Sequence, residues 1–142
     1  MNYKKYLHII VKVLFTAILL LPIAGSTGLL GEATRELYNT DAAFSFITQL
    51  TTDAVYISWM MTAVHILALI ALWTRREALA VLLELPIVAN VVGFHAFLDG
   101  GLLTGGAVLA NIYLLLVLYL LYANRETLKP LINQKRNDYA RQ

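Results

Sequence analysis

Two apolar stretches joined by a short charged turn decide the fold of this chain: Ala54–Trp73 (AVYISWMMTAVHILALIALW), then Thr74-Arg75-Arg76-Glu77, then Ala78–Leu98 (ALAVLLELPIVANVVGFHAFL). Each stretch approaches the roughly 20 helical residues that cross the hydrocarbon core of a bilayer. Polar and apolar residues do not alternate as in the strands of a membrane barrel. Backbone groups in lipid must be bonded within their own segment, so both stretches are predicted to be helices. The turn is short enough to make them antiparallel neighbours.

The composition extends this prediction to the whole chain. Of its 142 residues, 59% are hydrophobic and only 14% are charged, against about 25% charged in soluble domains. The apolar excess must therefore face lipid. The predicted spans are 7–30, 54–73, 78–98 and 102–122, followed by a basic tail over 123–142. We expect a single all-α membrane domain over 1–142, built as an antiparallel four-transmembrane-helix bundle. A cleaved signal peptide is the alternative for the first span, but its apolar run through Leu30 is long for a signal.

The distribution of positive charge predicts the orientation. Of the 11 lysines and arginines, all but Arg35 fall on one side of the predicted spans. They are Lys4, Lys5, Lys12, Arg75, Arg76, Arg125, Lys129, Lys135, Arg136 and Arg141. Because cationic residues collect on the cytoplasmic side, both chain ends are predicted to be cytoplasmic.

The outer loop, residues 31–53, is the only long connection. Asp41 could cap a short helix there that places Phe44, Ile47 and Leu50 on one face. Such a helix would lie in the outer membrane interface. A loop folded over the bundle is the alternative.

Small residues in the last span indicate close helix packing. Gly101 and Gly105 form one pair at helical spacing, and Gly106 and Ala110 form another. We favour packing within the monomer over a dimer interface.

Ionisable residues inside spans are costly and mark candidate functional sites. Glu84 lies eight residues after Arg76, and His65 lies ten residues before Arg75. At about 1.5 Å per residue, both lie roughly 12–15 Å from the inner boundary, so they can meet. Lys12 could reach the same group or extend to water. The site could handle protons or bind a polar ligand, and a purely structural pair is the alternative.

Two amides are predicted to meet near the membrane centre. Asn90 and Asn111 match in estimated depth and could bond across their helices. His65 and His95 lie roughly 15–20 Å apart along the membrane normal by the same estimate, which disfavours a bis-histidine haem. The chain has no cysteine and no spacing typical of metal ligands or nucleotide-binding loops, and nothing indicates nucleic acid binding. The basic tail would contact anionic lipid headgroups.

The second half of the chain carries a spaced pattern of polar residues. These are Pro86, Asn90, Phe94, His95 and Asp99, then Tyr122-Ala123-Asn124-Arg125 and Pro130-Leu131. In this pattern Leu85–Ile132 resembles the DoxX-like family of small four-span membrane proteins. The resemblance implies a bacterial inner-membrane location and a polar site at Asn90, His95 and Asp99. Relatives often carry a carboxylate inside the second span, where this chain has His65.

The resemblance also suggests a function. Some relatives are subunits or accessories of quinone-linked oxidoreductases, so we expect a subunit of such a system that is not catalytic alone. Quinone is then the implied cofactor, with no tightly bound metal or haem. Glu84 and His65 instead favour an oligomeric proton or solute transporter. A non-catalytic assembly protein or scaffold is the third hypothesis.

The orientation is testable by reporter fusions. Fusions after Asn39 and Gly100 should be active on the outside, and fusions after Arg75 and Gln142 in the cytoplasm, because the cations set the topology. Alkaline phosphatase and green fluorescent protein report the two sides. A cytoplasmic signal at Asn39 would contradict the four-span topology.

Overall fold

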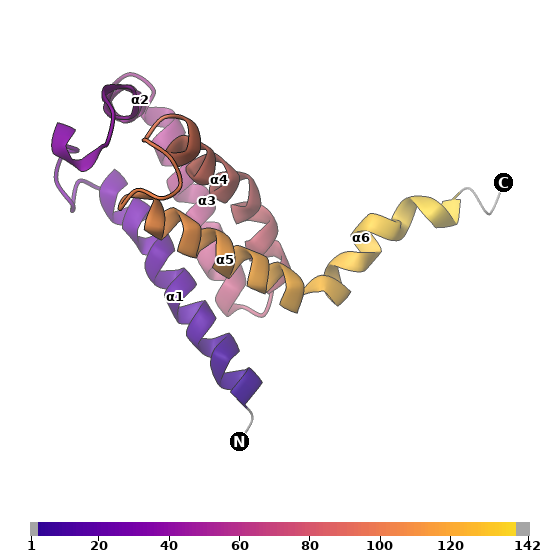
Figure 1. Cartoon of the computed structure of the whole chain (residues 1–142). Helices are drawn as coiled ribbons and strands as arrows, with labels where there is room; N and C mark the ends of the chain where they lie inside the picture. Colours follow the sequence, from indigo (N-terminus) through magenta and orange to yellow (C-terminus); the bar gives the residue numbers. More distant parts are fainter. Residues whose placement is uncertain (1–2, 139–142) are drawn as a thin grey trace.

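The computed structural model describes the backbone of residues 3–138 and the side chains of residues 3–131. This part of the chain is helical and contains no strand. The elements are α1 (Tyr3–Ser26), the short 3₁₀ helix η1 (Arg35–Leu37), α2 (Asp41–Thr52), α3 (Val55–Trp73), α4 (Glu77–Phe97), α5 (Ala107–Ala123) and α6 (Arg125–Asp138). Figure 1 shows α1, α3, α4 and α5 lying alongside one another, while α6 extends away from them.

Four helices pack in a closed ring. Helix α1 packs against α3 and α5, and α4 packs against the same two helices from the other side. The α3–α4 turn, the start of α1 and the end of α5 lie together at what we call the Arg75 end, where His8 and Asn124 both bond Glu77. The opposite end, called the Asp99 end, holds the α4–α5 connection, α2 and the end of α1.

Helix length and polarity indicate a multi-pass membrane protein. Within the described residues, α1, α3 and α4 are each long and apolar enough to cross a membrane. Helices α5 and α6 qualify only as a pair bent by 75°, so the candidate spans number three or at most four. The ring also exposes large apolar side chains such as Ile10, Leu67 and Leu115, each more than half exposed. Such a surface is typical of a protein in contact with lipid.

The last candidate span begins later than the sequence suggested. Residues 102–106 form turns, and α5 starts at Ala107. Gly101 has a φ of 106°, a left-handed conformation that side chains rarely adopt, so it belongs to the connection. The prediction that Gly101 and Gly105 form a helical packing pair is therefore wrong. Gly106 precedes the helix and Ala110 lies inside it, buried.

The outer loop contains the short helix that the sequence suggested. Thr40 caps α2 by accepting a bond from the Ala43 backbone N–H, so the cap lies one residue before the predicted Asp41. Phe44, Ile47 and Leu50 are half-buried on one face. Of the basic tail, the side chains of Lys135 and Arg136 lie outside the described ones, and Arg141 lies outside the described residues.

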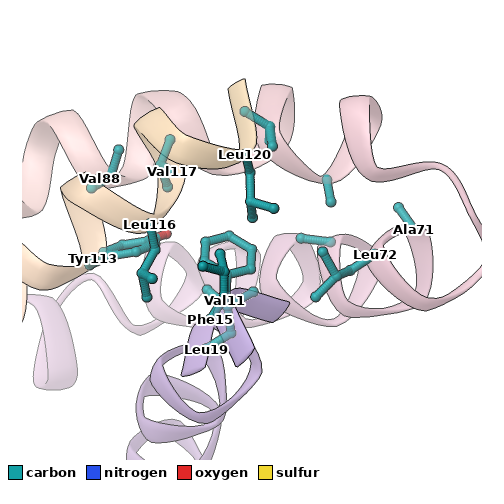
Figure 2. Packing of buried hydrophobic residues seen from close by; sticks show 13 residues of the cluster. Val11, Phe15, Leu19, Ala71, Leu72, Val88, Tyr113, Leu116, Val117 and Leu120 are labelled. Carbon is teal, nitrogen blue, oxygen red and sulfur yellow. The ribbon is translucent and has the colours of Figure 1, made fainter. Parts of the chain in front are cut away.

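The packed core lies nearer the Arg75 end. Its fully buried side chains include Phe15 of α1, Leu72 of α3, Val81 of α4, and Val117 and Leu120 of α5. Figure 2 shows the side chains of these helices meeting in one cluster. Towards the Asp99 end the buried residues are smaller, such as Ala107 and Ala110, and a partly open cavity lies between the helices there.

Candidate functional site

A buried carboxylate ties three helices together. Glu84 of α4 is fully buried. Nδ1 of His65, from α3, lies 3.0 Å from each carboxylate oxygen, and the Tyr113 hydroxyl of α5 donates to Oε2 at 2.5 Å. The predicted pair of Glu84 and His65 is present in the structure.

The third member of this group, Tyr113, was missed by the sequence analysis. The other tyrosines near the last span, Tyr119 and Tyr122, lie close to its end, whereas Tyr113 lies well inside it. A tyrosine in such a position needs a partner for its hydroxyl, and that requirement was the available signal. With His65 and Tyr113 bonded to one carboxylate, both Glu84 oxygens have partners within the protein.

Lys12 belongs to a separate cluster at the Arg75 end. Its Nζ lies 2.9 Å from Glu77 and 4.8 Å from the centre of the Trp73 ring, and His8 bonds the other oxygen of Glu77 at 2.8 Å. The structure therefore does not bring Lys12 to Glu84. The reason is physical: its long side chain extends towards the end of the helix ring, where a carboxylate is available nearer to water.

A second histidine–carboxylate pair lies at the Asp99 end. His95 Nδ1 lies 2.9 Å from Asp99 Oδ2, and the Asn39 backbone N–H donates to Oδ1 at 2.7 Å. Asp99 is only 1% exposed. The Thr40 hydroxyl donates to the Leu98 carbonyl, so both bonds tie the start of α2 to the end of α4. Burial, and secondarily the charge of Asp99, raise the pKa of the nearby Tyr38 hydroxyl.

Two of the predicted polar residues lie elsewhere. Asn90 donates to the Pro86 carbonyl of its own helix at 2.8 Å, and Asn111 donates to the Leu102 carbonyl at 2.8 Å. The prediction that Asn90 and Asn111 bond each other is wrong. The depth of Asn111 was counted from a span beginning near Leu102, but α5 begins at Ala107, so this amide caps the preceding connection. Of the predicted site at Asn90, His95 and Asp99, the structure brings only His95 and Asp99 together.

Gly106 completes the pair at the Asp99 end. A Cβ atom added to it would lie 3.3 Å from Asp99 Oδ2 and 3.4 Å from His95 Cε1. This residue therefore lets the backbone just before α5 approach the His95–Asp99 pair closely. Its predicted role as a small contact residue is present, although its neighbour is a polar pair and not an apolar helix.

Both imidazoles line one cavity of about 210 Å³ between α1, α3, α4 and α5. The remaining wall is mostly aliphatic, with Ile18, Ile87 and Leu109 among its residues. Each histidine uses Nδ1 to bond its carboxylate. Among the described residues, no hydrogen bond joins either Nε2 atom to another protein group. The two Nε2 atoms are thus the nitrogens available to a molecule in the cavity.

The cavity offers two imidazoles within a mostly aliphatic wall. No group of three or more His, Asp or Glu suited to a metal ion occurs among the residues that the structure describes. An apolar cavity with a few oriented polar groups is the usual form of a small-molecule site. A carboxylate on Nδ1 orients the ring and lets the histidine exchange a proton at Nε2.

Comparison with family models, with curated proteins and with solved structures gives no match. The resemblance to DoxX-like proteins remains a prediction that rests on the motif residues.

The Glu84 group predicts a distinctive pattern of stability. His65→Leu should lower the free energy of unfolding by up to about 3–5 kcal/mol, because it leaves a buried carboxyl group without its histidine partner. Tyr113→Phe removes one hydrogen bond between helices and should cost roughly 0.6–1.7 kcal/mol. The double change His65→Leu with Glu84→Leu should cost less than the sum of the two singles. Unfolding in mild detergent measures all four variants, and strict additivity would contradict a coupled pair.

Gly106 and Gly105 form a matched pair for testing the second site. Gly106→Ala places a methyl group against Asp99 and His95, whereas a Cβ on Gly105 meets nothing within 4 Å. We expect Gly106→Ala to shift the ring resonances of His95 in an NMR spectrum of histidine-labelled protein. Gly105→Ala should leave them unchanged. Equal shifts in both variants would mean that Gly106 does not contact the pair.

Proposed function

We propose that this protein binds the headgroup of a membrane quinone in the cavity lined by His65 and His95, as a subunit or accessory of a quinone-linked oxidoreductase. The observation that carries the proposal is that the imidazoles of one buried and one partly buried histidine–carboxylate pair line one otherwise apolar cavity. We also infer that α1, α3, α4 and α5 all cross a bacterial inner membrane, with the Arg75 end cytoplasmic. The charge distribution supports this orientation.

The chemistry of the cavity suits a quinone ring. Such a ring is flat and apolar on both faces and has two carbonyl oxygens that accept hydrogen bonds. The aliphatic wall accommodates the faces, and an imidazole Nε2–H can donate to a carbonyl oxygen. The volume of about 210 Å³ suits one small ring and not a haem.

The histidine–carboxylate pairs also suit the proton changes of a quinone. Reduction to the hydroquinone takes two electrons and two protons. In each pair, an imidazole protonated at both nitrogens can give its Nε2 proton to a quinone oxygen, while the Nδ1 proton stays in the bond to the carboxylate. The two electrons would come from the redox centre of the partner oxidoreductase, which is why the proposal includes such a partner.

A proton pathway is the second candidate function, and a different observation favours it. Histidine–carboxylate contacts occur at three levels along the helix ring: His8 with Glu77, His65 with Glu84, and His95 with Asp99. Chains of such residues are typical of proton relays in membrane proteins. Acidification of liposomes that depends on Glu84 but not on a quinone would support this function over the first.

The proposed function is tested with two ligands that differ only in their carbonyl groups. Tetramethyl-para-benzoquinone should bind the protein in nanodiscs more tightly than tetramethylbenzene, because only the quinone accepts hydrogen bonds. His95→Phe should weaken quinone binding roughly tenfold, the effect of losing about 1.4 kcal/mol. Equilibrium dialysis against protein-free nanodiscs corrects for partition into lipid.

The control is Trp59→Leu, which changes an exposed aromatic residue that does not line the cavity. This variant should bind the quinone as the unmodified protein does. Equal affinity of the unmodified protein for the quinone and the arene would contradict the proposal.

A further inference from the structure

A second hollow lies beside the cavity, between α2, α3 and α4. It is an apolar groove of about 870 Å³, much larger than the cavity of about 210 Å³. Phe46, Ile47 and Leu50 line it from α2, and α4 lines it from Pro86 to Leu98. We call it the α2–α4 groove.

The groove offers an occupant almost no hydrogen-bonding groups. Asn90 is its one polar side chain, and the amide nitrogen of Asn90 already donates to the Pro86 carbonyl. The α4 wall belongs to a helix that is apolar enough to cross a membrane. Water gains no hydrogen bonds in such a place, whereas a hydrocarbon chain fits it.

The groove and the cavity share part of their walls. Met61, Ile87 and Val91 line both hollows, so a single layer of side chains separates them. Met61 is only half-buried, and methionine is an unbranched side chain that adapts readily to its surroundings. A molecule with a ring in the cavity can therefore place its tail in the groove by displacing Met61.

We propose that the α2–α4 groove binds the isoprenoid or alkyl tail of the same amphiphile whose headgroup occupies the cavity. This inference rests on the proposed function and deepens it: the ligand class becomes a long-tailed quinone. A long apolar tail is the chemistry that matches a large apolar groove adjoining a small cavity with two imidazoles.

Helix α2 forms one wall of this groove and is hydrogen-bonded, through the residues before it, to the end of α4 near His95. Its first residues follow Asn39 and Thr40, which bond Asp99 and Leu98. Further along, the Phe46 ring lies 5.9 Å from the Phe94 ring, next to His95. The bonds to Asp99 and Leu98 thus also fix the position of α2 along the groove.

Gly93 allows the groove to be filled without disturbing the cavity. It lines the groove but not the cavity, and a Cβ atom on it meets nothing within 4 Å. Gly93→Leu should therefore occupy groove space while the helix stays intact. Gly25→Leu is the matched control, because Gly25 also lies in a helix, faces open space and lines neither hollow.

The experiment compares two ligands in nanodiscs, with affinities expressed per lipid so that partition cancels. They are tetramethyl-para-benzoquinone and the same ring with one methyl group replaced by decyl. The unmodified protein and Gly25→Leu should bind the decyl compound at least tenfold more tightly than the tail-less ring. Gly93→Leu should lose this gain and bind the tail-less ring as before. Ala89→Leu, which also fills the groove, serves as the second variant if Gly93→Leu does not fold.

Two outcomes would overturn the inference. If the tail adds no affinity in the unmodified protein, or if both groove-filling variants keep the gain, another chain such as that of a phospholipid fills the groove. In either case, binding of the tail-less ring would still support the proposed function, and only the inference about the tail would fail. If neither ligand binds, the proposed function fails and this inference fails with it.

Discussion

A fully buried carboxylate inside an apolar helix ring constrains the rest of this structure. An unpaired charge in the middle of a membrane costs about 2.5–3.5 kcal/mol on insertion scales, so Glu84 needs partners. His65 supplies one from α3 and Tyr113 supplies another from α5. The Tyr113 ring in turn lies 5.9 Å from the ring of Phe15 on α1. One side chain thus joins α3, α4 and α5, and α1 packs against the ring of one of its partners.

A second carboxylate, Asp99, is also bonded to a histidine, but its other partner is a loop backbone group. Asp99 follows the end of α4 and receives a bond from the Asn39 backbone, so the second carboxylate organises the outer loop and not the helix ring. Both acids hold a histidine through Nδ1. As a result, polar groups that join the helices and the outer loop also present two imidazoles to one cavity.

Depth counted along a helix predicts contacts well only where its starting point is secure. His65 and Glu84 were placed together because both were counted from the tight turn at Arg75 and Arg76, which the structure retains between α3 and α4. Asn111 was misplaced because the glycine-rich connection extends to Gly106. Lys12 was misassigned because a long side chain can reach several depths, and Glu77 lay closer.

The sequence by itself determined the helical class, the membrane environment and the pairing of two ionisable residues, because these follow from hydrophobicity, length and the cost of charge in lipid. Only the tertiary structure decided that Tyr113 completes the Glu84 group, that Gly106 lies against Asp99, and that His65 and His95 line one cavity. These features depend on the rotation of each helix about its axis and on how side chains from four helices fill space. Neither is encoded in the periodicity of helices that are apolar on nearly every side.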